Sequence, residues 1–170
     1  MQATGKPFSE LTATDLMSRD VIAVQQAMPL AAAARVLSRA QVTGAPVVDA
    51  DGVCVGVVSA TDFLRLANPD PNVSRQTCAG PVCVCSDWQM PDIHDLPADE
   101  VRHHMTRDPV TVRPHTPVTD LARLMLDAHI HRVIVVDGKG RPVGVVSSTD
   151  IIAAVARHEP ALATVGGAAH

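Results

Sequence analysis

Residues 55–62 read V-G-V-V-S-A-T-D, and residues 143–150 read V-G-V-V-S-S-T-D, 88 positions later. The same offset continues without a gap well beyond the two stretches; it aligns residues 47–49, for example, with residues 135–137. A repeat of this regularity indicates that the chain is built from two copies of one supersecondary unit.

Each stretch ends an apolar run with the order Ser-x-Thr-Asp. Side chains alternate between the two faces of a strand, and a Thr-Asp pair can open a helix. The polar groups would then gather at a strand end, beside free helix N–H groups, where a phosphate or a sugar can bind. A second interpretation stays open, because Asp62 and Asp150 could simply cap the helices that follow.

The composition predicts a soluble globular protein without nucleic acid as a partner. The chain has 170 residues, 46% of them hydrophobic, which is enough to bury a core. A net charge of -4 and an aromatic content of 2% argue against binding to nucleic acids. We find no apolar run of membrane-spanning length and no signal-peptide pattern at the start, so we expect a cytoplasmic location with reduced thiols.

The pattern within each repeat predicts the order helix–strand–helix–strand–strand–helix. Pro29 and the pair Thr116-Pro117 mark the starts of two amphipathic helices, with Thr116 as an expected N-cap. The expected helices are residues 11–17, 30–40, 61–67, 99–105, 118–129 and 149–158. The expected strands are residues 21–24, 45–48, 53–59, 110–112, 133–136 and 142–147. The fold class is α/β, of the α+β kind.

Together, the doubled Met-x-x-Asp opening, the Pro-Val-Val-Asp strand and the V-G-V-V-S-x-T-D stretch resemble a tandem pair of CBS domains, a Bateman module. The resemblance covers residues 11–67 and 99–158. It implies two domains, each a small three-stranded sheet with flanking helices, packed with pseudo-two-fold symmetry. Residues 1–10 and 159–170 would be flexible ends, and residues 68–98 a connector that contains cysteine and proline.

The resemblance also implies two clefts for adenosine-containing ligands. Asp62 and Asp150 would accept hydrogen bonds from ribose hydroxyls, since a carboxylate only accepts and a diol donates twice. The hydroxyl groups expected near phosphate belong to Ser59, Thr61, Ser147 and Thr149. The residues expected beside adenine, mainly through their backbone, are Ile22, Ala23, Ala45, Pro46, Val110, Thr111, Val133 and Ile134. The ligand classes are AMP, ADP and ATP, with S-adenosylmethionine or NAD as further candidates.

One position separates the two repeats. His131-Arg132 resembles the His-Arg pair that meets phosphate in nucleotide-sensing members of the family, and arginine can form a fork of hydrogen bonds with a phosphate. The aligned residues of the first repeat are Thr43-Gly44, without a cation. We therefore expect two unequal clefts.

Three cysteines in the expected connector, Cys78, Cys83 and Cys85, leave a second function open. Their spacing is not that of a common zinc motif, although His94 or Cys54 could supply a fourth ligand. The histidines at 103, 104, 129 and 131 are weak metal signals, and we expect no metal site among them.

No catalytic motif is found in the sequence, so we expect a regulatory module and not an enzyme. It would bind an adenosyl ligand and signal to a regulated protein that the sequence does not identify. Its apolar helices predict a homodimer formed through helix–helix contacts. The alternatives are a redox- or metal-responsive protein that uses the connector cysteines, and a dimerisation unit with empty clefts.

Overall fold

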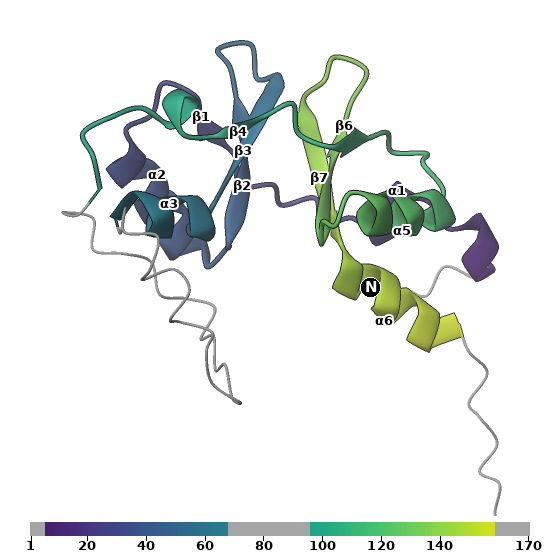
Figure 1. Ribbon diagram of the computed structural model, residues 1–170. Helices are drawn as coiled ribbons and strands as arrows, with labels where there is room; N and C mark the ends of the chain where they lie inside the picture. Colours follow the sequence, from purple (N-terminus) through teal and green to yellow (C-terminus); the bar gives the residue numbers. More distant parts are fainter. Residues whose placement is uncertain (1–5, 68–95, 159–170) are drawn as a thin grey trace, which may run out of the picture.

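The computed structural model describes residues 6–67 and 96–158, which form two halves of similar architecture (Figure 1). The expected connector cysteines and the end of the chain lie outside these residues. The first half of the sequence contains η1 (Phe8–Glu10), α1 (Ala13–Leu16), β1 (Val24–Gln25), α2 (Leu30–Ala40), β2 (Gly44–Val48), β3 (Cys54–Ser59) and α3 (Ala60–Ala67). The second half contains η3 (Val101–His103), β4 (Thr106–Arg107), β5 (Thr111–Val112), α5 (Val118–Asp127), β6 (Arg132–Val136), β7 (Pro142–Ser147) and α6 (Ser148–His158).

Each half has a small mixed sheet, as expected for the α/β class. In the first sheet β1 runs parallel to β2, and β2 pairs antiparallel with β3; in the second sheet β5, β6 and β7 repeat this pattern. The prediction of three strands in each sheet is wrong for the first sheet, because β4 adds a fourth strand beside β3. The corresponding contact in the second sheet is a single bridge between Ser18 and Val145.

The amphipathic helices form where the apolar spacing predicts them. Helix α2 spans residues 30–40 as expected and buries Leu30, Ala33, Ala34 and Leu37. The expected N-cap at Thr116 is wrong. Pro117 occupies the cap position of α5, and the Thr116 hydroxyl instead accepts a hydrogen bond of 3.1 Å from the Arg113 N–H, which closes the preceding turn.

In space, one half of the molecule surrounds the sheet of β1, β2 and β3, and the other surrounds the sheet of β5, β6 and β7. The leading segment of each repeat packs against the sheet of the other repeat. Figure 1 shows α1 beside α5 and α6, and β4 beside the first sheet. The core of the second half takes Leu11, Ala13, Leu16 and Met17 from the first repeat. The core of the first half takes Val101 from the second repeat and Leu96 from the end of the expected connector, and Met105 packs against it. Each hydrophobic core is therefore completed by residues that the sequence repeat assigns to the other half.

This exchange explains the glycine of the V-G-V-V stretch. A Cβ atom at Gly56 would lie 2.6 Å from Met105 Sδ and 2.8 Å from the Thr106 carbonyl oxygen. A Cβ atom at Gly144 would overlap Met17 in the same way. Only glycine lets the methionine of the exchanged segment lie this close to the strand.

The two sheets stand side by side at the centre of the molecule, with the helices outside them (Figure 1). Val48, Ile134 and Val136 are buried, yet they belong to neither helix-side core, so alternation along the strands directs them toward the other half. The hairpins also meet, where the Cys54 N–H donates to the Gly140 carbonyl at 2.9 Å. Within the described residues, no helix combines the length and hydropathy that crossing a bilayer requires.

Candidate ligand-binding site

Strand directions bring the predicted site residues to one end of each sheet. Parallel strands β1 and β2 begin at the same edge, and the antiparallel strand β3 ends there. In the first half this edge gathers residues 22–23, residues 43–44 and residues 59–62. With neighbouring strands about 4.8 Å apart, roughly 10 Å separate β1 from β3 across the sheet. This span suits a ligand with a flat base at one end and a sugar at the other.

The two aspartates are held in the same way in both halves. Asp62 Oδ2 accepts hydrogen bonds from the Ser59 N–H at 2.8 Å and from the Ser59 hydroxyl at 2.7 Å. Asp150 Oδ2 accepts the same pair from Ser147, at 2.8 and 2.6 Å. Among the described residues, Oδ1 of both carboxylates has no hydrogen-bond partner in the structure.

Both aspartates also make the contacts that helix capping predicts. Ser59 and Ser147 precede the first residues of α3 and α6, and each aspartate is the third residue of its helix. The side chain of that aspartate reaches back to the N–H of the cap residue, which is half of a capping box; in the second half the Asp150 N–H completes it at 3.2 Å from the Ser147 hydroxyl. Capping uses Oδ2 and fixes the rotamer, so it leaves Oδ1 as an oriented acceptor. The two interpretations are therefore compatible.

The residues expected beside adenine fall into two groups. Ile22 and Val110, at equivalent positions before β1 and β5, are each 36% exposed, so each presents apolar surface at its sheet end. Ala45 and Val133 are buried in the helix-side cores, so only their backbone could contact a ligand. Thr111 pairs in register with Ile134, as the predicted grouping of these strands requires.

Of the remaining predicted residues, Pro46 is buried in β2 and Ala23 is exposed before β1. Both predicted threonines, Thr61 and Thr149, are exposed in the first turns of their helices. Their hydroxyl groups are therefore open to a ligand at the helix start.

The side chain of the predicted cation, Arg132, contacts the other half of the molecule. Arg132 opens β6, and its Nη1 donates a hydrogen bond to the hydroxyl of Thr43, the residue just before β2. The sequence identified Thr43 only as a place without a cation; its position opposite Arg132 could not be read from the repeat.

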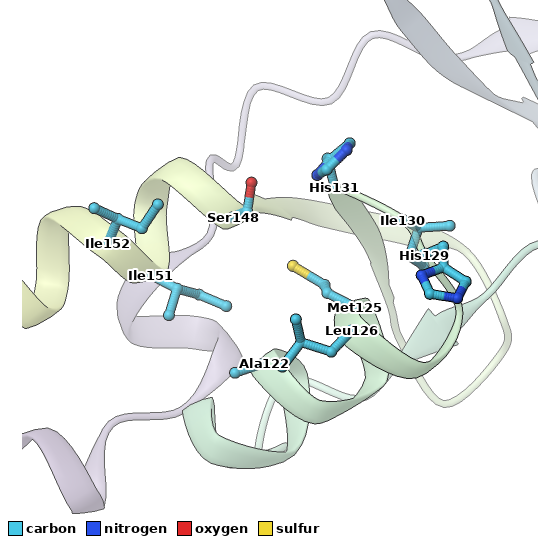
Figure 2. A pocket seen from close by; sticks show the side chains of 9 residues that line it. All are labelled: Ala122, Met125, Leu126, His129, Ile130, His131, Ser148, Ile151 and Ile152. Carbon is cyan, nitrogen blue, oxygen red and sulfur yellow. The ribbon is translucent and has the colours of Figure 1, made fainter.

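A pocket of about 390 Å³ lies on the helix side of the second half, and Figure 2 shows its lining. Apolar side chains of α5 and α6 form most of it, among them Met125, Leu126, Ile151 and Ile152. Of the predicted ligand residues only His131 lines this pocket. Leu126 and Ile152, which are 72% and 65% exposed, are not among the residues predicted from the sequence. In the sequence, each of them could be recognised as an apolar residue at a helix position where a polar residue is expected.

The two adjacent histidines bind a carboxylate. His103 Nδ1 lies 2.6 Å from Asp99 Oδ1, and His104 Nε2 lies 2.9 Å from Oδ2. Hydrogen bonds with His103, with the Glu100 N–H and with His104 hold the pKa of Asp99 well below its usual range. In the described part of the chain, no three histidine, cysteine or acidic residues form a group that could hold a metal ion.

Cys54 is the cysteine that lies within the described residues. Its Sγ donates to the Gly56 carbonyl at 3.6 Å, and burial raises the pKa of the thiol. A raised pKa lowers the thiolate fraction on which cysteine reactivity depends. Cys54 thus lacks the features of a reactive thiol.

Known proteins resemble this chain in sequence and in structure. The sequence model of the CBS domain matches residues 13–68 and 98–157. The chain is 32% identical over 127 residues to the chloroplastic CBS domain-containing protein CBSX2 of Arabidopsis thaliana, a match that covers 72% of this chain and 53% of that protein.

Solved structures show the same arrangement of elements. A crystal structure of CBSX2 in complex with AMP has a TM-score of 0.66 and 27% sequence identity, over 88% of this chain and 98% of that one. The CBS domain pair of protein MJ0100, in complex with 5'-methylthioadenosine and S-adenosyl-L-methionine, has a TM-score of 0.64. That match covers 86% of this chain and 97% of that one; at 24% identity it concerns the fold alone.

Proposed function

The chain belongs to the CBS-domain family, and from this premise we propose that it is a regulatory module that binds adenosine-containing ligands at its two sheet ends. Ligand binding would change the module's interaction with a regulated protein. We propose no catalytic activity for the chain.

The observation that carries the proposal is the arrangement of the two carboxylates. Each has one oxygen fixed by a serine and the other free of partners among the described residues. A ribose diol offers two donors to such an acceptor. Ile22 and Val110, exposed at the same sheet ends, supply apolar surface for a base. In each half the apolar residue precedes the first strand and the carboxylate follows the third, and these two strands are about 10 Å apart across the sheet.

The ligand class follows from the same surroundings. The exposed hydroxyls of Thr61 and Thr149 and the guanidinium of Arg132 can meet phosphate, which favours AMP, ADP and ATP. The AMP bound in the CBSX2 crystal structure supports this class. S-adenosylmethionine shares the adenosyl group, and the MJ0100 pair shows that a CBS pair of this fold can hold it.

We also propose that two copies of the chain associate through their helices. Leu126, Ile152 and Val155 expose apolar surface on α5 and α6, beside the pocket of Figure 2. Leu64 on α3, the equivalent of Ile152 in the first repeat, is 40% exposed. Related apolar faces on both halves suit a symmetric partner, because a two-fold dimer pairs a surface with itself.

Calorimetric titration with AMP, ATP and adenosine tests the ligand proposal. Asp62→Ala and Asp150→Ala each remove an acceptor for ribose, and each should weaken one site by about 1–3 kcal/mol, roughly five- to a hundredfold. The wild-type protein should gain near 2.7 kcal/mol of stability at about 100 times the dissociation constant of the ligand.

The control is Asp51→Ala, which removes an exposed carboxylate in the turn between β2 and β3. This turn lies at the opposite end of the sheet from Ser59 and Asp62. If the wild type binds none of the three ligands, or all variants bind alike, the aspartates are helix caps only. Metal analysis of the purified protein tests the alternative function of Cys78, Cys83 and Cys85.

A further inference from the structure

The helix layers of the two halves carry opposite net charge. Helices α2 and α3 hold three arginines and one aspartate, a net charge of +2, and the arginines are exposed: Arg35, Arg39 and Arg65. Helices α5 and α6 hold three aspartates and two arginines, a net charge of -1 with histidine neutral, and Asp120 and Asp127 are exposed on α5. Within the described residues, the three arginines of α2 and α3 form no ion pair, so their charges are available to a partner.

The two helix layers also differ in shape at equivalent positions. In the second half, Ile151 and Ile152 of α6 line the pocket together with Leu126 of α5 (Figure 2). In the first half, the larger ring of Phe63 takes the position of Ile151 and is fully buried, and Leu64, in the position of Ile152, is 40% exposed. The second half thus presents an apolar cavity, and the first half presents an apolar side chain that could enter one.

Two arrangements of a two-fold dimer can cover these surfaces. In one, each helix layer meets its own copy. In the other, the α2–α3 layer of one copy meets the α5–α6 layer of the second. Both arrangements bury the same four layers, so the apolar area removed from water is nearly equal, and the hydrophobic effect does not distinguish them. Charge and shape therefore decide.

We infer that two copies of the chain meet head to tail, with the α2–α3 layer of each on the α5–α6 layer of the other. This inference rests on the proposed dimer and deepens it, since it assigns a partner to each helix layer. The basic layer of one copy then faces the acidic layer of the second, and Leu64 faces the pocket beside Ile152 of the second copy.

The other arrangement is disfavoured by its electrostatics. It would bring Arg35, Arg39 and Arg65 of one copy against the same three arginines of the second, and like charges repel across an interface. It would also place two cavities opposite each other and two Leu64 side chains opposite each other. The head-to-tail dimer avoids both mismatches.

The first experiment places new charges at Leu64 and Ile152 of one chain and measures self-association by light scattering at low salt over a concentration series. Leu64→Asp with Ile152→Lys brings opposite charges together only in the head-to-tail dimer. We expect this double variant to associate at least about tenfold more tightly than Leu64→Asp with Ile152→Asp, and than Leu64→Lys with Ile152→Lys. These two like-charged doubles control for net charge, because one lies above and the other below that of the test variant. In 1 M salt, where the screening length is about 3 Å, the difference should largely disappear.

A second set of variants reverses native charges on exposed side chains and leaves the apolar residues unchanged. Arg39→Glu with Arg65→Glu changes the net charge of α2 and α3 from +2 to -2 and should weaken association roughly tenfold. Adding Asp127→Arg changes α5 and α6 from -1 to +1 and should restore most of the association. If each layer met its own copy, all of these variants would associate about as tightly as the wild type.

Two results would overturn the head-to-tail dimer. One is an opposite-charged double variant that associates no more tightly than both like-charged doubles. The other is a reversed basic layer that leaves the association unchanged or is not rescued by Asp127→Arg. Either result leaves a dimer with each layer on its own copy, whereas a wild-type chain that stays at the mass of one chain ends the proposed dimer itself. The titrations with AMP, ATP and adenosine test ligand binding independently of all these outcomes.

Discussion

The first and second halves hold their aspartates alike but differ in what surrounds them. Both carboxylates accept two hydrogen bonds from the preceding serine, at 2.8 and 2.7 Å in the first half and at 2.8 and 2.6 Å in the second. The second half adds Arg132, an exposed apolar helix face and a pocket, while the first half adds a fourth strand. A repeated local motif thus preserves the proposed ribose acceptor, and the surfaces between and outside the halves make the two proposed sites different.

The largest expected effect compares the two glycines under the exchanged methionines. Gly56→Ala and Gly144→Ala should each destabilise the protein by about 1–3 kcal/mol, because the new methyl group overlaps a neighbour that must move. The loss should be greater at Gly56, where the obstacle includes the Thr106 carbonyl of β4, than at Gly144, where it is the Met17 side chain. Chemical denaturation measures both.

The control for this comparison is Gly138→Ala, since a Cβ atom there would have no neighbour within 4 Å and the change should stay within about 0.5 kcal/mol. Shortening the obstacle with Met17→Ala should restore part of the stability of Gly144→Ala. Equal, negligible losses at both glycines would mean that the exchanged segments do not lock the halves.

The next effect compares the helix faces of the two halves. Ile152→Asp places a charge on a side chain that is 65% exposed, and it should weaken self-association by roughly tenfold or more, about 1.4 kcal/mol. Leu64→Asp, at the equivalent position, should weaken it less because that side chain is 40% exposed. Light scattering over a concentration series measures the association, with 17.9 kDa as the mass of one chain.

A wild-type protein that stays at the mass of one chain at tens of micromolar would contradict the proposed dimer. Ala50→Asp provides the matched control for introduced charge, because it adds one negative charge, as Ile152→Asp does, at an exposed position in the turn between β2 and β3, away from the helix faces. It should change the association far less than Ile152→Asp.

The smallest effect compares the leading segments, which carry Asp15 in the first repeat and Asp99 in the second. Hydrogen bonds lower the pKa of Asp99, so the ionised form stabilises the folded state above the unfolded pKa of about 3.9. That contribution is lost as the pH falls from about 4 through the lower folded pKa. Asp99→Asn should therefore reduce the free energy of unfolding at pH 7 and make little difference near the acid end.

Asp15 should behave similarly in direction. Burial raises its pKa, but hydrogen bonds from Thr12 and Lys6 outweigh burial and the net shift is downward. Denaturation of Asp99→Asn, Asp15→Asn and wild type at pH 7 and at pH 3 measures both contributions. A difference between wild type and Asp99→Asn that grows toward low pH would contradict the assigned hydrogen bonds.

The sequence by itself determined the repeat, the sheet-end clusters and most of the element order, with the exception of the expected helix over residues 99–105, where the structure has η3 and β4. These features are local: apolar spacing selects the helix over residues 30–40, and the serine and aspartate of Ser-x-Thr-Asp are three residues apart, within reach of one helix turn. The predicted placement of Thr111 beside Ile134 is also found as strand pairing, since β5 and β6 pair in that register. The sequence could not distinguish helix capping from ribose binding for the aspartates, because one carboxylate can do both, with a different oxygen for each.

Only the tertiary structure decided how the halves combine. The exchange of leading segments, the methionines over Gly56 and Gly144, the fourth strand β4 and the crossing of Arg132 to Thr43 all join residues distant in sequence. Aligned repeats reveal which positions are equivalent, but they contain no information on which repeat supplies a neighbour. Docking of two similar units settles that, because each hydrophobic core needs the apolar surface of the other unit's leading segment to exclude water.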